Sequence, residues 1–167
     1  KQMNAGAGAA RSDVLLFLHA DCALPANADR LIFDGLTASG KAWGRFDVTL
    51  ASTRPPLKIV AFMMNLRSRL SGIATGDQGI FISRSMFASL GGFPPIPLME
   101  DIALSRRANH VHAPLCLRSR IVASARRWEQ HGVLRTIALM WWLRLAYFLG
   151  ADPARLALNY DAVRQRD

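Results

Sequence analysis

The segment LLFLHADC, from Leu15 to Cys22, decides the fold expected for this chain. Its apolar residues end abruptly at His19, Ala20 and Asp21, and Pro25 closes the segment. A short apolar run bounded by turn signals predicts a buried strand of a parallel sheet, and ligands of such sheets bind just outside the carboxyl ends of the strands. Because side chains alternate along a strand, His19 and Asp21 can point the same way and share one divalent cation. The alternative is a strand that simply ends in polar residues.

Composition narrows the class of protein. The chain has 167 residues, of which 51% are hydrophobic, so it is long enough for one domain with a core and is not a disordered segment. The net charge of +9 favours an anionic partner: a nucleotide, a phosphorylated lipid, a nucleic acid or a membrane surface. Two cysteines give no disulfide framework, which favours a reducing, cytoplasmic location. No apolar stretch has membrane length without a charge, although association with a membrane surface stays open.

Helices and strands alternate along the rest of the chain. The first residues, KQMNAGAGAARSD, resemble the interior of a domain, so we expect strands of the sheet to precede Lys1 in a longer protein. Periodicity and Gly/Pro punctuation predict one further strand at 43–52 and another within 75–83, after a polar turn. They predict helices at 2–12, 26–38, 57–70, 85–90, 102–108, 133–148 and 154–164, with Met63 and Met64 as core residues of the third.

Two further groups carry candidate chemistry. Glu100 and Asp101 follow a Pro-rich loop and start a helix, where carboxylates serve as caps or as a general base. From Ile102 to Trp128 there is no acidic residue but there are six arginines, which form either a solvated basic face or a phosphate site. A metal-bound aspartate, arginines for a diphosphate and a separate carboxylate base are the parts that a nucleotide-sugar transferase needs.

The chain resembles the inverting glycosyltransferase family 2, of GT-A fold, and within it the bacterial "transferase 2" branch associated with arsenosugar biosynthesis. The resemblance is carried by QMNAGA, LLFLHADCALP, GDQGIFISRSMFASLGGFPPIPLMEDIALSRR, SARRWEQHG and WWLRLAYFLGADPARLALNY. It implies an α/β protein with a mixed, mostly parallel sheet flanked by helices, without its first N-terminal strands. Residues 1–132 would belong to the GT-A domain, and 133–167 to a C-terminal helical extension packed on it or lying at an interface.

The same resemblance assigns roles to individual residues. Asp21, the last aspartate of the family's DXD motif, would bind Mn²⁺ or Mg²⁺ and the donor diphosphate, with His19 in place of the first aspartate. Asp101 would be the general base and Glu100 its neighbour in the loop. The other assignments are Asn4, Gly6, Arg126 and Arg127 for the nucleotide-sugar donor, and Asp77, Gln78 and Trp128 for the acceptor cleft. Ser124 replaces the glutamine of the family's QXXRW signature.

Other functions stay open at this level. The basic run and the helix with Trp141 and Trp142 would also suit a non-catalytic module that binds an anionic membrane surface or a partner protein. Nucleic-acid binding is disfavoured, because the aromatic residues are not interleaved with the basic ones. An incomplete sheet could be completed in a homo-oligomer. His110 and His112 lack a further ligand cluster, and His131 is the better placed histidine for a diphosphate.

Overall fold

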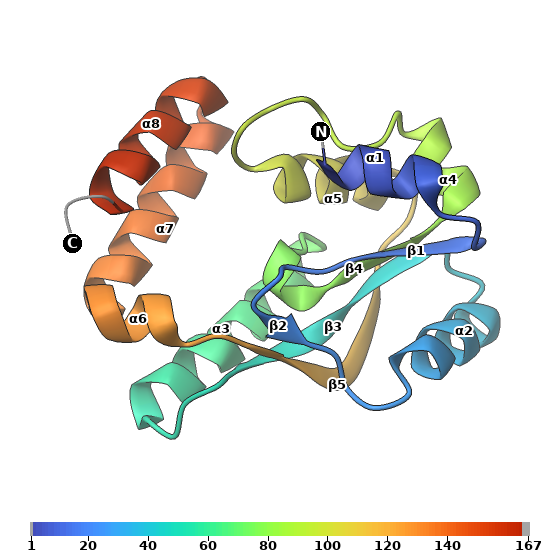
Figure 1. Cartoon of the computed structure of the whole chain (residues 1–167), viewed down its shortest axis with the longest axis horizontal. Coiled ribbons are helices and arrows are strands. Elements are labelled where there is room, and N and C mark those ends of the chain that lie inside the picture. The colour runs from blue at the N-terminus through green and yellow to red at the C-terminus, as the bar shows by residue number, and fades with distance from the viewer. Residues whose placement is uncertain (1, 165–167) are drawn as a thin grey trace.

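A five-stranded mixed sheet lies at the centre of the computed structural model, which describes residues 2–164 (Figure 1). The spatial order is β1-β4-β3-β5-β2. The strands are β1 (Val14–Phe17), β2 (Cys22–Ala23), β3 (Trp43–Leu50), β4 (Ile80–Ser83) and β5 (Leu115–Ala123). The α/β class with flanking helices is therefore confirmed.

The expectation of a mostly parallel sheet is wrong. Only β3 and β5 pair in parallel, whereas β1–β4, β3–β4 and β2–β5 are antiparallel. The strand before His19 lies at the edge of this sheet, where it pairs with β4 alone. The apolar run of β4, Ile80 to Ile82, is buried throughout. Strands that are buried in this way read as continuous apolar runs in either direction, so composition does not report the direction of pairing.

Strands β2 and β5 were not predicted. In the second half of β5 the exposed Arg118, Arg120 and Val122 alternate with half-buried or buried residues up to Ala123. The arginines of this segment predicted a solvated basic face or a phosphate site, although their alternation with less exposed residues is typical of a half-buried strand. β5 carries the chain from the far side of the sheet to Ser124, beside the segment that follows His19, where Ser124 N donates to Asp21 O.

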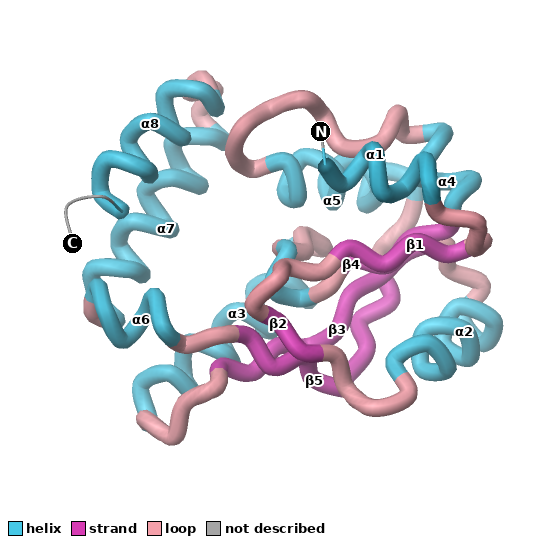
Figure 2. The backbone as a smooth tube through the Cα atoms, viewed as in Figure 1, coloured by secondary structure: helices cyan, strands magenta, loops and turns pink. Residues whose placement is uncertain are grey.

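The predicted helices are present. They are α1 (Gln2–Ala9), α2 (Ala28–Ser39), α3 (Pro55–Ser71), α4 (Arg84–Ser89), α5 (Glu100–Val111), α7 (Val133–Phe148) and α8 (Pro153–Arg164); the short α6 (Arg126–His131) and the 3-10 turn η1 (Gly76–Gln78) complete the order. Figure 2 shows helices on both sides of the sheet, with α6, α7 and α8 grouped at one end. Leu143 of α7 and Leu156 of α8 share a buried cluster with Met99 and Ile102 at the start of α5. One expectation fails: Met63 is 49% exposed and is not a core residue.

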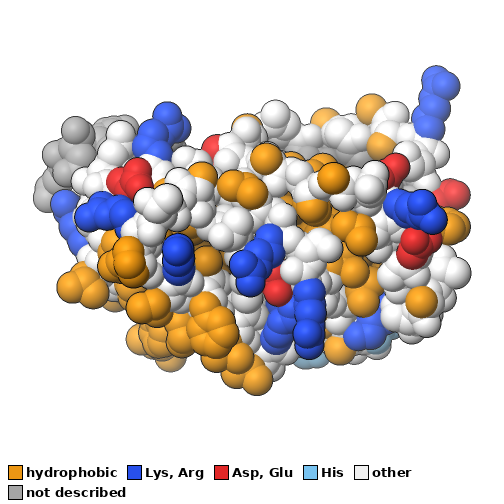
Figure 3. Space-filling view, turned by 90° about the horizontal axis from the view of Figure 1, so that it is seen from below, with side chains coloured by type: hydrophobic (Ala, Val, Ile, Leu, Met, Phe, Trp, Pro, Cys, Tyr) orange, Lys and Arg blue, Asp and Glu red, His pale blue; other side chains and the backbone are white. Residues whose placement is uncertain are grey.

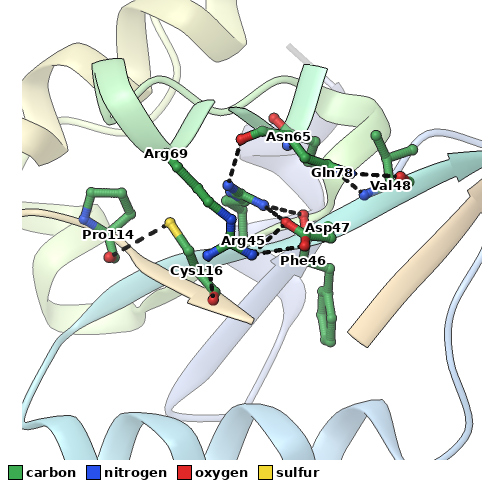
Figure 4. Close-up of polar contacts among 9 residues, drawn as sticks. All are labelled: Arg45, Phe46, Asp47, Val48, Asn65, Arg69, Gln78, Pro114 and Cys116. Atoms are coloured by element: carbon green, nitrogen blue, oxygen red, sulfur yellow. Dashed lines mark hydrogen bonds and ion pairs between the residues drawn. The ribbon is translucent and has the colours of Figure 1, made fainter. Parts of the chain in front are cut away.

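A polar network fixes α3 to β3 (Figure 4). Arg45 is fully buried and contacts the carboxylate of Asp47, which also accepts two hydrogen bonds from Arg69 at 2.8 and 2.7 Å. Asn65 brackets Val48, accepting from its N–H at 2.8 Å and donating to its carbonyl at 2.9 Å. Because Gln78 also donates to Asn65 at 3.4 Å, the network ties η1 to the same helix and strand.

Candidate functional site

Three metal-ligating side chains meet where β1 ends. His19 and Asp21 lie in the turn after β1, and Asp77 comes from η1, much later in the chain. One ligand atom from each lies within 4.8 Å of the others, and His19 Nδ1 is 3.2 Å from Asp77 Oδ1. The structure thus brings together the predicted pair, and it adds Asp77, which the resemblance had placed in an acceptor cleft. We call these three residues the His19–Asp21–Asp77 cluster.

A glycine allows this approach. A Cβ at Gly76 would lie 2.0 Å from Nε2 of His19, so only glycine leaves room for the imidazole over η1. The N–H of Gly76 donates to Asp101 Oδ2 at 2.9 Å. Gly76 therefore contacts His19 of the cluster and hydrogen-bonds Asp101, the predicted base, so it links the two.

The histidine and Asp77 stabilise each other's charged form. The hydrogen bond to Asp77 raises the pKa of His19 against the effect of burial, and the charges of Asp77, Asp101 and Asp21 act in the same direction. Burial by itself would raise the pKa of Asp77. The hydrogen bond and charge of His19, with Arg127 and Arg144, nevertheless hold it below its usual value. Asp77 is therefore a carboxylate at neutral pH and is available as a cation ligand.

Cys22 lies next to the cluster, and its thiol is shifted toward the protonated form. Burial, aided by the charges of Asp77 and Asp21, raises the pKa of its thiol to about 12. The thiol stays protonated at neutral pH, and thiolates rather than thiols are nucleophiles. Both cysteines of the chain are free.

The predicted base lies beside the cluster, in the first turn of α5. Asp101 accepts from the N–H groups of Gly76 and Ile102, at 2.9 and 2.7 Å, which fixes its carboxylate. Glu100 and Asp101 line one small pocket together with His19 and Gly76. Burial raises the pKa of Glu100, and the neighbouring charge of Asp101 adds to the rise. The pocket holds about 20 Å³, and the rest of its lining is apolar: Met3, Phe17, Leu18, Ile80 and Phe93.

A larger pocket of about 290 Å³ includes Asp21 of the cluster in its lining. We call it the basic pocket; its lining includes Asp21, Ser124, Arg126, Arg127, Gln130, His131, Arg135, Thr136 and Tyr160. Arg126 and Arg127, assigned to the donor from sequence, both lie here, and the guanidinium of Arg127 stands 5.6 Å from the centre of the Tyr160 ring. Guanidinium groups around a cavity of this size suit a phosphate-bearing ligand.

The remaining predicted residues line neither of these pockets. The amide of Asn4 exchanges two hydrogen bonds with the backbone of Phe93, at 2.9 and 3.0 Å, and so holds α1 to the loop after α4. Gly6 lies on the exposed side of α1 with no atom near its Cβ position. Gln78 is fully buried, and Trp128 packs on the core cluster under α3.

Sequence reasoning missed two arginines near the site. Arg67 of α3 and Arg144 of α7 are both within charge range of Asp101 and Asp77. Arg144 had a signal in the sequence, as a central cation in an otherwise apolar helix. Arg67 had none, because basic residues at its spacing are common on solvated helix faces.

Comparison with known proteins gives no family. No family model matches the chain, and no curated protein matches it significantly. Along residues 2–164, no helix combines the length and the apolar character that crossing a membrane requires.

Proposed function

We propose that the protein is a glycosyltransferase that moves a sugar from a nucleotide-diphosphate donor to an acceptor hydroxyl with inversion. One observation carries the proposal: the His19–Asp21–Asp77 cluster lies between the basic pocket and the carboxylate of Asp101. A cation site with anion-binding arginines on one side and a carboxylate base on the other matches the needs of this reaction.

The donor set fits a divalent cation. One imidazole and two carboxylates are ligands that Mn²⁺ accepts, and Mg²⁺ accepts the carboxylates together with water. The hydrogen bond between His19 and Asp77, at 3.2 Å, depends on a proton that a bound cation would replace. A bound cation would supply Lewis-acid stabilisation of the departing diphosphate.

The chain's own residues account for the remaining steps. Arg126 and Arg127 bind the diphosphate oxygens and stabilise the charge that grows as the sugar–phosphate bond breaks. Asp101 takes the proton of the acceptor hydroxyl. The oxygen of that hydroxyl forms the new bond to the anomeric carbon, from the face opposite the departing diphosphate. The hydrogen bond from Gly76 N–H orients the Asp101 carboxylate for this transfer.

The test is turnover of nucleotide-sugars with Mn²⁺ present, using Asp101→Asn. We expect donor hydrolysis and transfer by the wild-type protein to be lost in EDTA. The amide introduced by Asp101→Asn keeps the shape of the side chain but cannot accept the proton, so we expect turnover to fall by about 10²–10⁴-fold with an unchanged circular dichroism spectrum. Asp29→Asn, on the exposed face of α2, is the matched control and should retain full turnover. Unchanged turnover in Asp101→Asn would refute the assignment of the base.

A second proposal, docking on an anionic membrane surface, is favoured by an exposed apolar face. On α3 the exposed apolar residues follow helical spacing: Ile59, Phe62, Met63, Leu66 and Leu70. On α7 they are Leu134, Trp141, Trp142, Leu145 and Phe148, and Leu149 follows directly. Figure 3 shows hydrophobic side chains gathered on one side of the face seen from below, with Lys and Arg beside them. α7 carries apolar residues on its buried side and on its exposed side. A helix of this kind is normally buried on all sides, so a binding partner is expected on its outer face.

Charge complementarity selects a lipid surface as the partner. Neither α3 nor α7 contains an acidic residue, whereas the exposed Lys58 lies beside the stripe on α3. A second copy of the chain would place like charges opposite each other, whereas anionic lipid headgroups would neutralise them. We expect sedimentation with vesicles of phosphatidylcholine and phosphatidylglycerol, weaker at high salt, and reduced in Trp141→Ser/Trp142→Ser. Equal sedimentation of that variant, or self-association without vesicle binding, would refute this surface.

A further inference from the structure

Two arginines within charge range of Asp101, Arg67 and Arg144, form no ion pair with a carboxylate whose side chain is described. Nε and Nη2 of Arg67 are shielded from solvent and have no hydrogen-bond partner in the described part of the chain. Arg144 likewise makes no hydrogen bond or ion pair with any of residues 2–160 whose side chains are described. Other partly buried arginines differ: Arg107, for example, donates to the carbonyls of Leu90 and Gly92 at 2.6 Å each.

Packing brings α7, which carries Arg144, to the candidate base, and brings α3, which carries Arg67, to the start of α7. Leu143 of α7 lies in one cluster with Met99 and Ile102, the residues on either side of Glu100 and Asp101. Arg144 is the next residue along α7, and the two carboxylates whose charges act on it are Asp101 and Asp77. Arg67 comes one helical turn after Met64 of α3, which packs on a cluster shared with the start of α7.

The electrostatics agree with this placement. Burial and the neighbouring charge of Arg144 lower the pKa of Arg67 to about 10, while Asp101 and Asp77 partly oppose the shift. Burial also lowers the pKa of Arg144. Neither carboxylate forms an ion pair with the two arginines: Asp101 accepts from backbone N–H groups, and Asp77 pairs with His19. Two partly desolvated cations therefore lie within charge range of each other, and neither forms an ion pair with a carboxylate whose side chain is described.

We propose that Arg67 and Arg144 bind an oxyanion, a phosphate or carboxylate group, carried by the acceptor substrate. The paired guanidinium groups offer the planar donor forks that such groups accept. The acceptor is favoured over the donor because Asp101, the base that the acceptor hydroxyl must reach, is the carboxylate whose charge acts most strongly on both arginines, and neither arginine lines the basic pocket that holds Arg126 and Arg127. The assignment to the acceptor rests on the proposed function, but the anion site itself does not.

The experiment measures oxyanion binding without metal or donor. The ¹⁵N-labelled protein in EDTA is titrated with inorganic phosphate and, separately, with acetate, and the two titrations distinguish a phosphate site from a carboxylate site. We expect Arg67→Met and Arg144→Met each to weaken binding of the preferred anion at least ten-fold. Arg118→Met, on the exposed side of β5, is the matched control and should bind as the wild type does. Arg127→Met reports on the basic pocket separately.

Thermal unfolding in the absence of phosphate separates binding from a structural role. An arginine that stabilises the fold lowers Tm when it is removed, whereas removal of an unpaired cation leaves Tm unchanged or raises it. We expect the second result for Arg67→Met and Arg144→Met. Arg67→Lys keeps the positive charge but lacks the planar N–H donors of the guanidinium group, so it should bind the anion with intermediate affinity. This variant keeps the proposal testable if Arg67→Met does not fold.

Two results would overturn the anion site: wild-type binding in both methionine variants, or loss of binding in Arg127→Met alone. Failure of the proposed function would look different. If no nucleotide-sugar were turned over while oxyanion binding still depended on Arg67 and Arg144, the site would stand and its assignment to an acceptor would fall.

Discussion

Asp77 links the parts of the candidate site at the scale of single residues. Its carboxylate hydrogen-bonds His19, and its backbone follows Gly76, whose N–H holds Asp101. A change at η1 therefore acts on the cation ligands and on the base together. The same coupling depends on the close contact between Gly76 and the His19 ring, which leaves no room for a side chain.

The pH dependence of stability follows from His19. Its pKa is raised in the folded protein by the hydrogen bond to Asp77, so its contribution to stability is complete below the unfolded value of 6.5 and is lost as the pH rises through the folded pKa. Because both side chains are partly exposed, at 49% and 38%, we expect less than about 1 kcal/mol.

Urea unfolding of the metal-free protein between pH 6 and pH 9 measures this loss. Asp77→Asn should make the profile flatter over that range, since its amide gives His19 no charge to stabilise. A profile that is equally steep in the variant would show that another group titrates. Divalent cations should oppose the loss at high pH, because a cation competes with the proton on His19.

At the scale of elements, the attachment of α3 to β3 depends on one carboxylate. Asp47 is the ion-pair partner of the fully buried Arg45 and of Arg69. Asp47→Ala leaves Arg45 without its counter-charge, and breaking a buried pair in this way costs about 3–5 kcal/mol. We expect that loss in the free energy of urea unfolding. Asp34→Ala removes the exposed pair with Arg30 and should cost less than about 0.5 kcal/mol; equal losses in the two variants would refute the role of the network.

The predictability of the elements follows from the kind of signal each one gives. Helices were predictable because apolar spacing and Gly or Pro punctuation are local; α3, for instance, begins with two prolines and ends before Gly72. Strand direction was not, because pairing joins segments far apart, as Val14 with Ser83. β5 was not predicted because its exposed arginines resemble a solvated basic segment, although they alternate with less exposed residues as in a strand.

The candidate site divides in the same way. His19 and Asp21 were predictable as a pair because they are two residues apart on one chain segment. Glu100 and Asp101 were predictable because their loop and helix start are visible locally. The addition of Asp77 to the cluster depends on the tertiary approach of η1, and the positions of Arg67 and Arg144 depend on how α3 and α7 pack. Asn4 was assigned to the donor from the sequence, but tertiary packing gives its amide a structural partner, the backbone of Phe93.

At the scale of the whole molecule, the proposed site lies where separate parts of the fold meet. The edge strand β1 provides the turn with His19 and Asp21, the centre of the sheet supports η1, and α5 contributes Asp101. The C-terminal helices close the basic pocket with Arg127 and Tyr160. Helices α6 to α8 are therefore part of the site as well as the carriers of the exposed apolar face (Figure 1).

Binding of Mn²⁺ tests the central claim most directly. Titration of the purified protein, followed by the electron paramagnetic resonance of free Mn²⁺, should show one bound ion, held more tightly when a nucleoside diphosphate is present. Asp21→Asn and Asp77→Asn should each weaken binding at least about ten-fold, whereas Asp34→Asn should not change it. No bound Mn²⁺ in the wild-type protein, or equal binding in all three variants, would contradict the account.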